Sequence, residues 1–352
     1  MQQTTRYYAS RDLPPSPPYL RLCVVSSAGG HLKEVLELIP RSGPFDIRFV
    51  VNDSINIDLP WPVDIITHAE RDFRLFINFY EAFDYLIKYR PDVIISTGAS
   101  PIVPFSIICK LFGCRVIFIE TFGAVRVPSL TGRLMIRLAD RFYYQWKTLG
   151  KYFPKGLFVG QVFKPNISNK NQFLEAKKKN NKHRISVFVA VGTSKNGFDR
   201  LLRWIDKICD VDKTRFHFYA QRGHSKYIPR NYESETFFTD DIIEEQIGLA
   251  DVVICHAGAG LAGNCIRLGK YPILVPRMKC FGEAINDHQV SFANAMVETG
   301  QTLIVTEESH LVPAIENAAM PRSGKTYTDK HELRDAVLHD LLEFARDKGI
   351  VL

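Results

Sequence analysis

The chain has 352 residues, of which 46% are hydrophobic and 24% charged. This composition is typical of a globular protein and excludes a disordered or fibrous chain, and the length predicts about two domains. Seven scattered cysteines without close C-x-x-C pairs indicate a reducing cytosol and argue against a disulfide framework or a zinc site. No segment reaches the roughly 18 to 20 uninterrupted apolar residues of a spanning helix. The proline-rich residues 1–19 are expected to form a polar extension rather than a signal peptide.

The net charge of +7 is concentrated in the first half, where residues 1–165 hold 20 Lys and Arg against 14 Asp and Glu. This excess favours a membrane surface or a phosphorylated acceptor as partner. A solvated surface with a chance excess explains the count equally well. The run KKKNNKHR at 177–184 has no interleaved aromatic residues, so no nucleic-acid partner is expected.

Strand-like and helix-like patterns alternate along the first half of the chain. Strands are predicted at 20–27, 46–51, 63–67, 92–96, 115–120 and 141–145. Helices are predicted at 31–39, 72–89, 101–112 and from about residue 130. Such alternation indicates a parallel, doubly wound sheet.

A polar linker at 166–184 interrupts this scheme, which then starts again. Further strands are predicted at 185–191, 215–220, 236–238, 251–255, 272–275 and 302–305. The two strand, glycine-turn, helix openings lie roughly one domain length apart. The predicted fold class is therefore α/β, with two Rossmann-like doubly wound parallel-sheet domains at 20–165 and 185–320 facing a cleft. A C-terminal helical segment at 321–352 is expected to pack back on the first domain.

Polar residues follow several predicted strands, at the sheet edge where doubly wound proteins bind ligands. In the second domain these residues are Gly192, Thr193, His256, Gly258, Gly260, Glu283, His288 and Gln289. In the first domain they are Gly29, Gly30, His31, Thr97, Gly98 and Glu120. Each domain is thus expected to carry part of a binding site.

Residues 258–263 also spell the dinucleotide motif G-x-G-x-x-G after a strand, with Glu283 at the spacing of a ribose-binding acid. This pattern keeps a nicotinamide or flavin oxidoreductase as an alternative. Against it, the next strand ends in Pro276 and Arg277, where the ribose-binding acid should stand.

The ordered series of motifs resembles a known family of glycosyltransferases. SSAGGHLKEVLEL, PDVIISTGAS and VIFIETF are similar to the membrane-side subunit of two-part enzymes that extend lipid-linked saccharides, such as the dolichol-linked N-acetylglucosaminyltransferase. FVAVGTSKNGFDRLL, HAGAG and GEAINDHQ are similar to the partner subunit that carries the donor site. Bacterial exopolysaccharide enzymes of the PssD and PssE type have the same two halves, and MurG is more distantly similar. The resemblance covers roughly residues 20–310.

The resemblance implies a GT-B glycosyltransferase that is inverting and metal-independent, with a UDP-sugar as substrate and no cofactor. It implies transfer to a polyprenyl-diphosphate saccharide in surface polysaccharide synthesis, with UDP-glucuronate as the leading donor. UDP-galactose, UDP-glucose and UDP-N-acetylglucosamine stay open as donors. The protein is expected to be cytoplasmic and peripherally bound to the inner face of the cell membrane. An NAD(P)-dependent oxidoreductase and a non-catalytic sugar-nucleotide-binding subunit are the other classes considered.

Glycosyl transfer needs a base for the acceptor hydroxyl and groups that hold the leaving diphosphate. His31 is the expected base because an imidazole titrates near neutrality, with capping of the first helix as its structural alternative. Glu120 is the rival base or an acceptor ligand. Glycine-rich helix starts at 192–194 and 257–260 are expected to hold the donor diphosphate. Gly29, Gly30, Thr97, Gly98 and Arg126 are expected on the acceptor side.

The donor-sugar contacts follow from the resemblance. His288 and Gln289 match the position whose side chains reach the sugar hydroxyls, and Glu283 lies on the same loop, where it alternatively caps a helix. Asn264 stands where many relatives have Glu, and its amide is expected to hydrogen-bond the ribose without charge. Arg277, Lys279 or Arg222 is expected to pair with the carboxylate of a glucuronate donor.

The predicted helix at 72–89 carries an aromatic stripe between basic residues. The stripe consists of Phe73, Phe76, Phe79, Tyr80, Phe83 and Leu86, and the flanks are Arg71, Arg74, Lys88 and Arg90. Such a stripe is usually core, but the basic flanks favour a helix that lies in the membrane interface.

Overall fold

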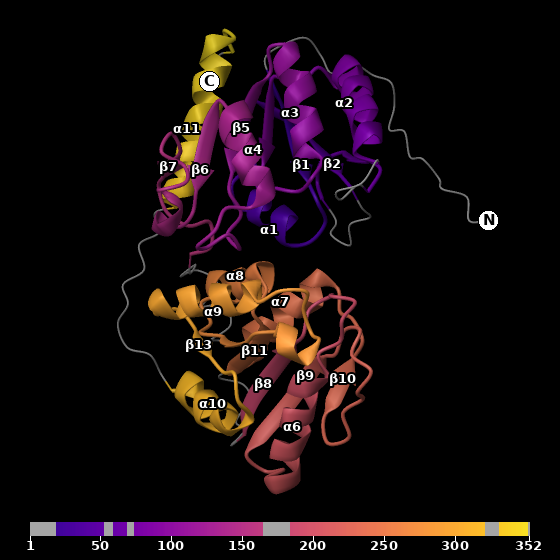
Figure 1. The fold of residues 1–352 in the computed structure, drawn as a ribbon, viewed down its shortest axis with the longest axis vertical. Coiled ribbons are helices and arrows are strands. Elements are labelled where there is room, and N and C mark those ends of the chain that lie inside the picture. The colour runs from indigo at the N-terminus through magenta and orange to yellow at the C-terminus, as the bar shows by residue number, and fades with distance from the viewer. Residues whose placement is uncertain (1–18, 53–58, 69–73, 165–183, 321–330, 351–352) are drawn as a thin grey trace, which may run out of the picture. The chain divides into compact units, whose positions relative to one another are not determined.

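The computed structural model describes residues 19–52, 59–68, 74–164, 184–320 and 331–350. The chain divides into two compact units, unit 1 of residues 1–162 and 331–352 and unit 2 of residues 163–330 (Figure 1). The expected extension at 1–19 and linker at 166–184 lie almost wholly outside the described residues. Each unit is an α/β structure built on a parallel sheet, which confirms the predicted fold class.

Unit 1 contains a seven-stranded sheet with the order β3-β2-β1-β4-β5-β6-β7. Its strands are β1 (Leu20–Ser26), β2 (Phe45–Val51), β3 (Val63–Ile65), β4 (Val93–Ser96), β5 (Arg115–Ile119), β6 (Arg141–Tyr144) and β7 (Leu157–Phe158). Its helices are α1 (Gly30–Leu36), α2 (Leu75–Tyr89), α3 (Ile102–Leu111), α4 (Leu130–Leu138), α11 (Glu332–Asp347) and the short 3₁₀ turn η1 (Lys147–Leu149). The first six strands agree with the predicted ones, and only β7 was not predicted.

The order of these strands creates a topological switch point. β1 pairs with β2 on one side and with β4 on the other, all in parallel. The chain therefore runs outward in one direction through β2 and β3, and in the opposite direction from β4 onward. Connections leave a crevice at the carboxyl ends of the strands at such a point, and ligands bind there in open α/β sheets.

The C-terminal helix α11 belongs to unit 1 and runs alongside β6 (Figure 1). Arg141 of β6 donates from Nε to Asp340 at 3.0 Å and from Nη2 to Glu343 at 3.0 Å. The hydroxyl of Tyr143 donates to the second oxygen of Asp340 at 2.5 Å. These polar contacts attach α11 to the edge of the sheet.

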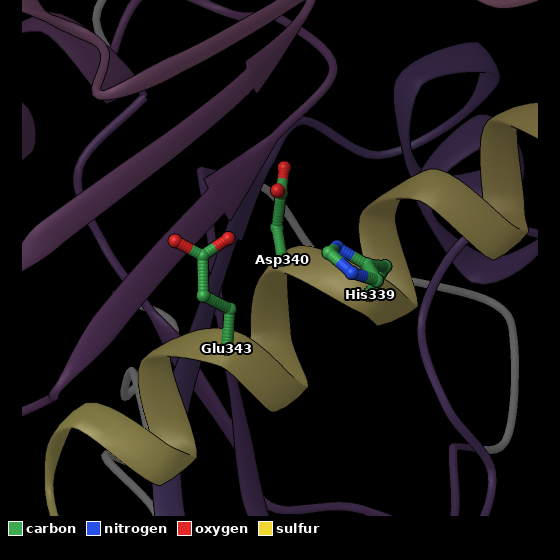
Figure 2. Close-up of side chains that lie close together, drawn as sticks. All are labelled: His339, Asp340 and Glu343. Carbon is green, nitrogen blue, oxygen red and sulfur yellow. The ribbon is translucent and has the colours of Figure 1, made fainter.

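Asp340, Glu343 and His339 lie close together on α11 (Figure 2). Such a trio has the ligand types of a metal site. Here both carboxylates already accept hydrogen bonds from the Arg141 guanidinium, and Asp340 accepts a further one from Tyr143. The arrangement is therefore a polar clamp for the helix.

Unit 2 contains a six-stranded parallel sheet with the order β10-β9-β8-β11-β12-β13. The strands are β8 (Ile185–Ala190), β9 (Phe216–Gln221), β10 (Glu233–Glu235), β11 (Val252–His256), β12 (Ile273–Val275) and β13 (Leu303–Ile304). The helices are α6 (Asp199–Val211), α7 (Asp240–Leu249), α8 (Ala259–Arg267), α9 (His288–Glu298) and α10 (Leu311–Ala319), with 3₁₀ turns η2 (Lys279–Phe281) and η3 (Glu308–His310).

One predicted strand of unit 2 is misplaced. The aromatic run at 236–238 has high strand propensity, but β10 is formed by the preceding Glu233–Glu235. The backbone N–H of Phe238 bonds to the side chain of Gln221, at 3.1 Å, instead of entering the sheet. Tertiary contacts thus override local propensity at this edge.

Both faces of the unit 2 sheet are covered by helices. Val187 and Val189 of β8 pack in one cluster with α6 and α10, and the alternate residues Phe188 and Ala190 pack in a second cluster with α7 and α8. This explains why β8 is continuously apolar from Val187 to Ala190 rather than alternating. The switch point of unit 2 lies between β8 and β11.

Candidate functional site

Three loops of unit 2 carry the polar residues predicted to bind the donor. They follow β8, β11 and β12, which are neighbours in the sheet, and comprise residues 191–197, 256–260 and 276–289. We call this group of loops the glycine-loop site. It contains all ten predicted donor-binding residues except Asn264, which lies on α8 directly after the second loop.

The imidazole of His256 is held between two of these loops. A Cβ atom at Gly192 would lie 2.3 Å from its Cε1, and one at Gly258 would lie 2.2 Å from its Nε2. Its Nδ1 lies 3.5 Å from the carbonyl oxygen of Ala190. Burial, assisted by the positive charge of Arg277, lowers the pKa of His256 to about 4. The ring is therefore neutral, and glycine is required at both positions for the loops to approach it.

Helix α8 begins directly after this contact. Its N-cap, Gly258, provides no side-chain cap, so the first N–H groups of α8 have no side-chain acceptor at the cap position. Gly260 lies in the first helical turn, and Thr193 is exposed on the facing loop after β8. Free N–H groups at a helix start attract phosphate through the helix dipole.

Asn264 lies one turn further along α8 and is 3% exposed. Its Oδ1 accepts hydrogen bonds from Nε and Nη2 of Arg267, at 3.1 and 2.5 Å. Its Nδ2 is buried without a partner. A buried unpaired N–H group is costly, which makes this amide a candidate ligand contact.

Arg277 is buried beneath the loop after β8, with 1% of its surface exposed. Its guanidinium donates to the carbonyl oxygens of Val191, at 2.6 Å, of Asn196 and of Gly197, at 3.3 Å. Its backbone N–H donates to Oε1 of Gln289 at 3.0 Å. The expected pairing with a donor carboxylate does not match this geometry, in which Arg277 shapes the loop and orients Gln289.

Glu283 is also engaged within unit 2. Its carboxylate accepts two hydrogen bonds from Arg200, at 2.8 and 2.9 Å, and one from the backbone of Met278 at 3.1 Å. The cap of α9 is Asp287, so Glu283 does not cap that helix. His288 is exposed at the first position of α9. Glu283 therefore fixes the loop that leads to His288 and Gln289, and it is not free to bind a ribose as a dinucleotide-site acid.

In unit 1 the loops after β1, β4 and β5 meet at the switch point. Gly29 caps α1 with φ 96°, a conformation that favours glycine. The His31 ring packs against Gly98, where a Cβ atom would lie 2.5 Å from its Cε1. The Thr97 hydroxyl donates to the His31 carbonyl oxygen at 2.8 Å. His31 is half-buried with its Nδ1 unpartnered, and burial lowers its pKa, so the ring is neutral near pH 7.

Glu120 follows β5 and is completely buried. Its Oε1 accepts a hydrogen bond from the backbone N–H of Thr121 at 3.2 Å. Its Oε2 lies against Gly132 of α4, where an added Cβ atom would come within 1.6 Å of it. Burial raises the pKa of Glu120 to about 7, against the opposing hydrogen bonds of Ser129 and Thr121. The carboxyl group thus lies under the first turn of α4, whereas Arg126 is exposed on the loop before that helix.

Glu34 was missed by the sequence reasoning. It is 1% exposed and accepts hydrogen bonds from the Thr121 hydroxyl at 2.7 Å, the Phe122 backbone at 2.9 Å and Gln145 Nε2 at 3.2 Å. Gln145 also donates to the Glu120 carbonyl oxygen at 3.0 Å. Burial raises the pKa of Glu34 to about 8. A signal was available, because Glu34 lies between Leu32 and Val35 on the apolar side of the helix.

Two family models match the chain. Residues 69–162 match the Alg14-like oligosaccharide biosynthesis protein family, and residues 186–342 match the glycosyltransferase family 28 C-terminal domain. The UDP-N-acetylglucosamine transferase subunit ALG14 of Mus musculus is 23% identical over 180 residues, covering 41% of the chain and 83% of that relative. A UDP-N-acetylglucosamine–N-acetylmuramyl-(pentapeptide) pyrophosphoryl-undecaprenol N-acetylglucosamine transferase of Myxococcus xanthus is 23% identical, covering 67% of the chain and 61% of that relative.

Solved structures share the fold. MurG of Acinetobacter baumannii superimposes with a TM-score of 0.58 at 15% identity, covering 92% of the chain and 99% of MurG. UDP-GlcNAc 2-epimerase of Methanocaldococcus jannaschii, in complex with UDP-GlcNAc and UDP, superimposes with a TM-score of 0.62 at 12% identity over the same shares. These matches establish the GT-B fold of two parallel-sheet α/β domains.

Proposed function

We propose that this chain is a GT-B glycosyltransferase that joins an Alg14-like half to a family 28 C-terminal half. On this premise, it transfers a sugar from a UDP-sugar to a polyprenyl-diphosphate-linked saccharide. The observation that carries the proposal is the glycine-loop site. Two glycines are needed there for the close approach of His256, a helix starts without a side-chain cap, and Asn264 holds an unpaired buried donor. This set fits a diphosphate and the ribose attached to it.

The donor-side groups act without a metal in this proposal. The N–H groups at the start of α8 and in the loop after β8 hold the diphosphate as its charge develops, and Gln289, oriented by Arg277, keeps its amide nitrogen for a sugar hydroxyl. The acceptor hydroxyl attacks the anomeric carbon as the bond to UDP breaks, so the configuration inverts. The same loops also contain Gly192, Thr193, Gly260 and His288.

His31 is the proposed base on the acceptor side. Its ring is neutral, half-exposed and lies at the switch point of unit 1 beside Thr97 and Gly98, so it is able to accept the proton of an acceptor hydroxyl. Glu120 is completely buried under α4, and we assign it a positioning role for the loop and helix. Gly29, Gly30 and Arg126 are proposed to contact the acceptor diphosphate.

The donor sugar is proposed to be N-acetylglucosamine. Of the two relatives named above, one is a UDP-N-acetylglucosamine transferase subunit and the other an N-acetylglucosamine transferase. For glucuronic acid, the donor favoured by the sequence resemblance, Arg277 is occupied by loop carbonyls, which leaves Lys279 and Arg222 as the expected partners of its carboxylate. UDP-glucuronate, UDP-glucose and UDP-galactose are the comparison donors in the test, and surface polysaccharide synthesis is the proposed role.

Membrane binding is proposed for the exposed face of α2. Phe76, Tyr80, Phe83 and Ile87 recur along one side of this helix and are 77%, 71%, 43% and 53% exposed. Leu86 is buried and belongs to the core, while Phe73 and Arg71 lie outside the described residues. No helix in the described ranges is long and apolar enough to cross a membrane. An apolar helix face with basic neighbours suits peripheral attachment to the inner face of the cell membrane.

A ligand panel tests the proposed function. UDP, the four UDP-sugars, NAD and NADP are compared by thermal shift and calorimetry, since a ligand that binds only the folded state raises the melting temperature. We expect stabilisation by UDP and by one UDP-sugar, and none by NAD or NADP. Stabilisation by a dinucleotide alone would instead support an oxidoreductase, and UDP binding without turnover on lipid-linked acceptors would support a silent binding subunit.

A further inference from the structure

A cavity of unit 2 lies on the α6 side of the glycine-loop site and shares Lys195, Gly197 and residues 281–283 with two of its loops. It has a volume of about 560 Å³ and is lined by α6, by the end of the loop after β8, by the loop after β9 and by the turn at 281–283. His256, Gly258, Asn264 and Gln289 do not line it. The cations of this cavity have no role in the proposed transfer reaction.

The lining is strongly basic. Its cations are Lys195, Arg200, Arg203, Lys207 and Lys226, and its carboxylates are Asp199 and Glu283. Both carboxylates are already engaged: Asp199 accepts from the backbone N–H groups of Lys226 and Tyr227 at 2.9 and 3.2 Å, and Glu283 binds Arg200. Within the described ranges, the side chains of Lys195 and Lys226 form no ion pair. A concave surface of one charge concentrates ligands of the opposite charge.

One cation of the cavity is rigidly placed. The Arg200 side chain is 12% exposed, and its guanidinium lies 4.6 Å from the ring centre of Trp204 and 4.7 Å from that of Phe281. Its Nη1 is buried and has no hydrogen-bond partner. Arginine held between aromatic rings loses little freedom when it binds an oxyanion. The remaining cations are exposed and surround it.

We propose that this cavity is a second anion site, which binds a small ligand carrying at least two phosphate groups independently of the glycine-loop site. Arg200 is paired with Glu283 and Lys207 with Glu308, at 2.8 Å each, which leaves Lys195, Arg203 and Lys226 without an ion pair in the described ranges. Three such cations around one cavity match a ligand of several charges better than a single phosphate or carboxylate. The wall at 195–197 continues the loop that Arg277 holds, and the wall at 281–283 leads to His288. An occupant therefore contacts two of the three loops that form the glycine-loop site.

Calorimetric titration of the full chain with inorganic diphosphate, at constant ionic strength and without divalent cations, tests the proposal. We expect saturable binding, at least roughly tenfold tighter than inorganic phosphate, and a roughly tenfold or greater loss in the Lys195→Gln/Lys226→Gln variant. Lys213→Gln, which removes an exposed charge just beyond the C-terminal end of α6, is the matched control and should bind as wild type. In wild type, diphosphate binding should also change the tryptophan fluorescence. Trp204→Phe should keep the binding measured by calorimetry and lose this fluorescence change.

Two further results decide whether the site is separate. Asn264→Ala, which alters the glycine-loop site alone, should leave diphosphate affinity unchanged, and saturating UDP should not displace the diphosphate. Loss of diphosphate binding in Asn264→Ala, or its displacement by UDP, would overturn the proposal. So would the absence of saturable binding, or equal affinity of wild type and the Lys195→Gln/Lys226→Gln variant. Failure of the chain to bind UDP would sink the proposed transfer reaction without affecting this result.

Discussion

At the scale of single residues, His256 shows how glycine and histidine act together. Gly258 has φ −90° and ψ 128°, a conformation that any residue adopts, so space alone requires glycine there. We expect Gly258→Ala to push against the imidazole, to lower the free energy of unfolding by about 1–3 kcal/mol and to weaken UDP binding. Urea denaturation and calorimetry measure the two effects.

The double variant Gly258→Ala/His256→Ala supplies the control for this prediction. Removing the ring makes room for the added methyl group, so the double variant should lose less stability than the sum of the two single variants. The prediction is contradicted if the double variant loses as much stability as the two single variants together. It is also contradicted if Gly258→Ala keeps the stability and the UDP affinity of wild type, because the close contact with the His256 ring would then contribute to neither.

Glu120 predicts a pH dependence of stability. Its pKa is about 7 in the folded chain and near 4.5 in the unfolded chain. Between these values the folded state holds a proton that the unfolded state has released, so this group lowers stability as the pH rises, by up to about 1.4 kcal/mol per pH unit. Glu120→Gln should therefore gain stability relative to wild type from pH 5 to about pH 7, with no further gain above that range.

Urea unfolding at several pH values tests this expectation, with exposed Glu245→Gln as the control that should follow wild type. A constant difference between Glu120→Gln and wild type across this range would contradict the raised pKa and the buried position of the carboxyl group.

Residue patterns pointed to the glycines and His256 as candidate site residues, because a glycine directly after a strand has few other structural explanations. They did not reveal the long-range partners. Glu283 was expected at the donor, yet its charge is taken up by Arg200, 83 positions earlier in the chain. Glu34 likewise bonds to the backbone of Phe122, 88 positions later. Such pairings depend on tertiary packing, which local spacing does not encode.

At the scale of elements, α2 carries the proposed membrane face. We expect the full chain to float with vesicles that contain phosphatidylglycerol, and the variant Phe76→Ser/Tyr80→Ser/Phe83→Ser to lose roughly tenfold or more of this affinity, because each ring buries apolar surface in the interface. Val211→Ser removes an 89% exposed apolar side chain of unit 2 and should not change flotation. If wild type stayed with the soluble fraction, α2 would not be a membrane element.

The clamp between α11 and β6 gives a second prediction at this scale. Asp340→Ala removes the acceptor of both Arg141 and Tyr143 in a mostly buried position. We expect the free energy of unfolding of unit 1 to fall by about 2–4 kcal/mol. His339→Ala, next to it but exposed, should change it by less than about 0.5 kcal/mol. Equal stability of the two variants in urea denaturation would show that α11 is attached by its apolar contacts alone.

Most elements were predictable because apolar periodicity and glycine turns agree along the chain. The exceptions have physical reasons. β7 is only two residues long, and β10 precedes the aromatic run because Gln221 binds the backbone of that run. The expected helix at 72–89 begins, among the described residues, at Leu75. Its stripe divides between core and surface, with Leu86 buried and Phe76 exposed.

At the scale of the whole molecule, each unit repeats one plan, with a switch point between its first strand and the strand that begins the second half of the sheet. The restart at residue 185 made this plan visible in the sequence. Sequence alone did not determine which side chains hold α11 on unit 1, since the ion pairs of Arg141 join residues about 200 positions apart. The proposed acceptor-side groups lie in unit 1 and the proposed donor-side groups in unit 2, so each unit would bind one of the two substrates.

The most direct test is a transfer assay with the purified full chain, radiolabelled UDP-sugars and polyprenyl-diphosphate saccharides. We predict that label from one UDP-sugar, with UDP-N-acetylglucosamine first, appears in the lipid fraction without added metal, and that His31→Ala lowers the rate by roughly 10²- to 10⁴-fold while UDP affinity is kept. Absence of labelled lipid with every donor and acceptor, from a chain that binds UDP, would contradict the account.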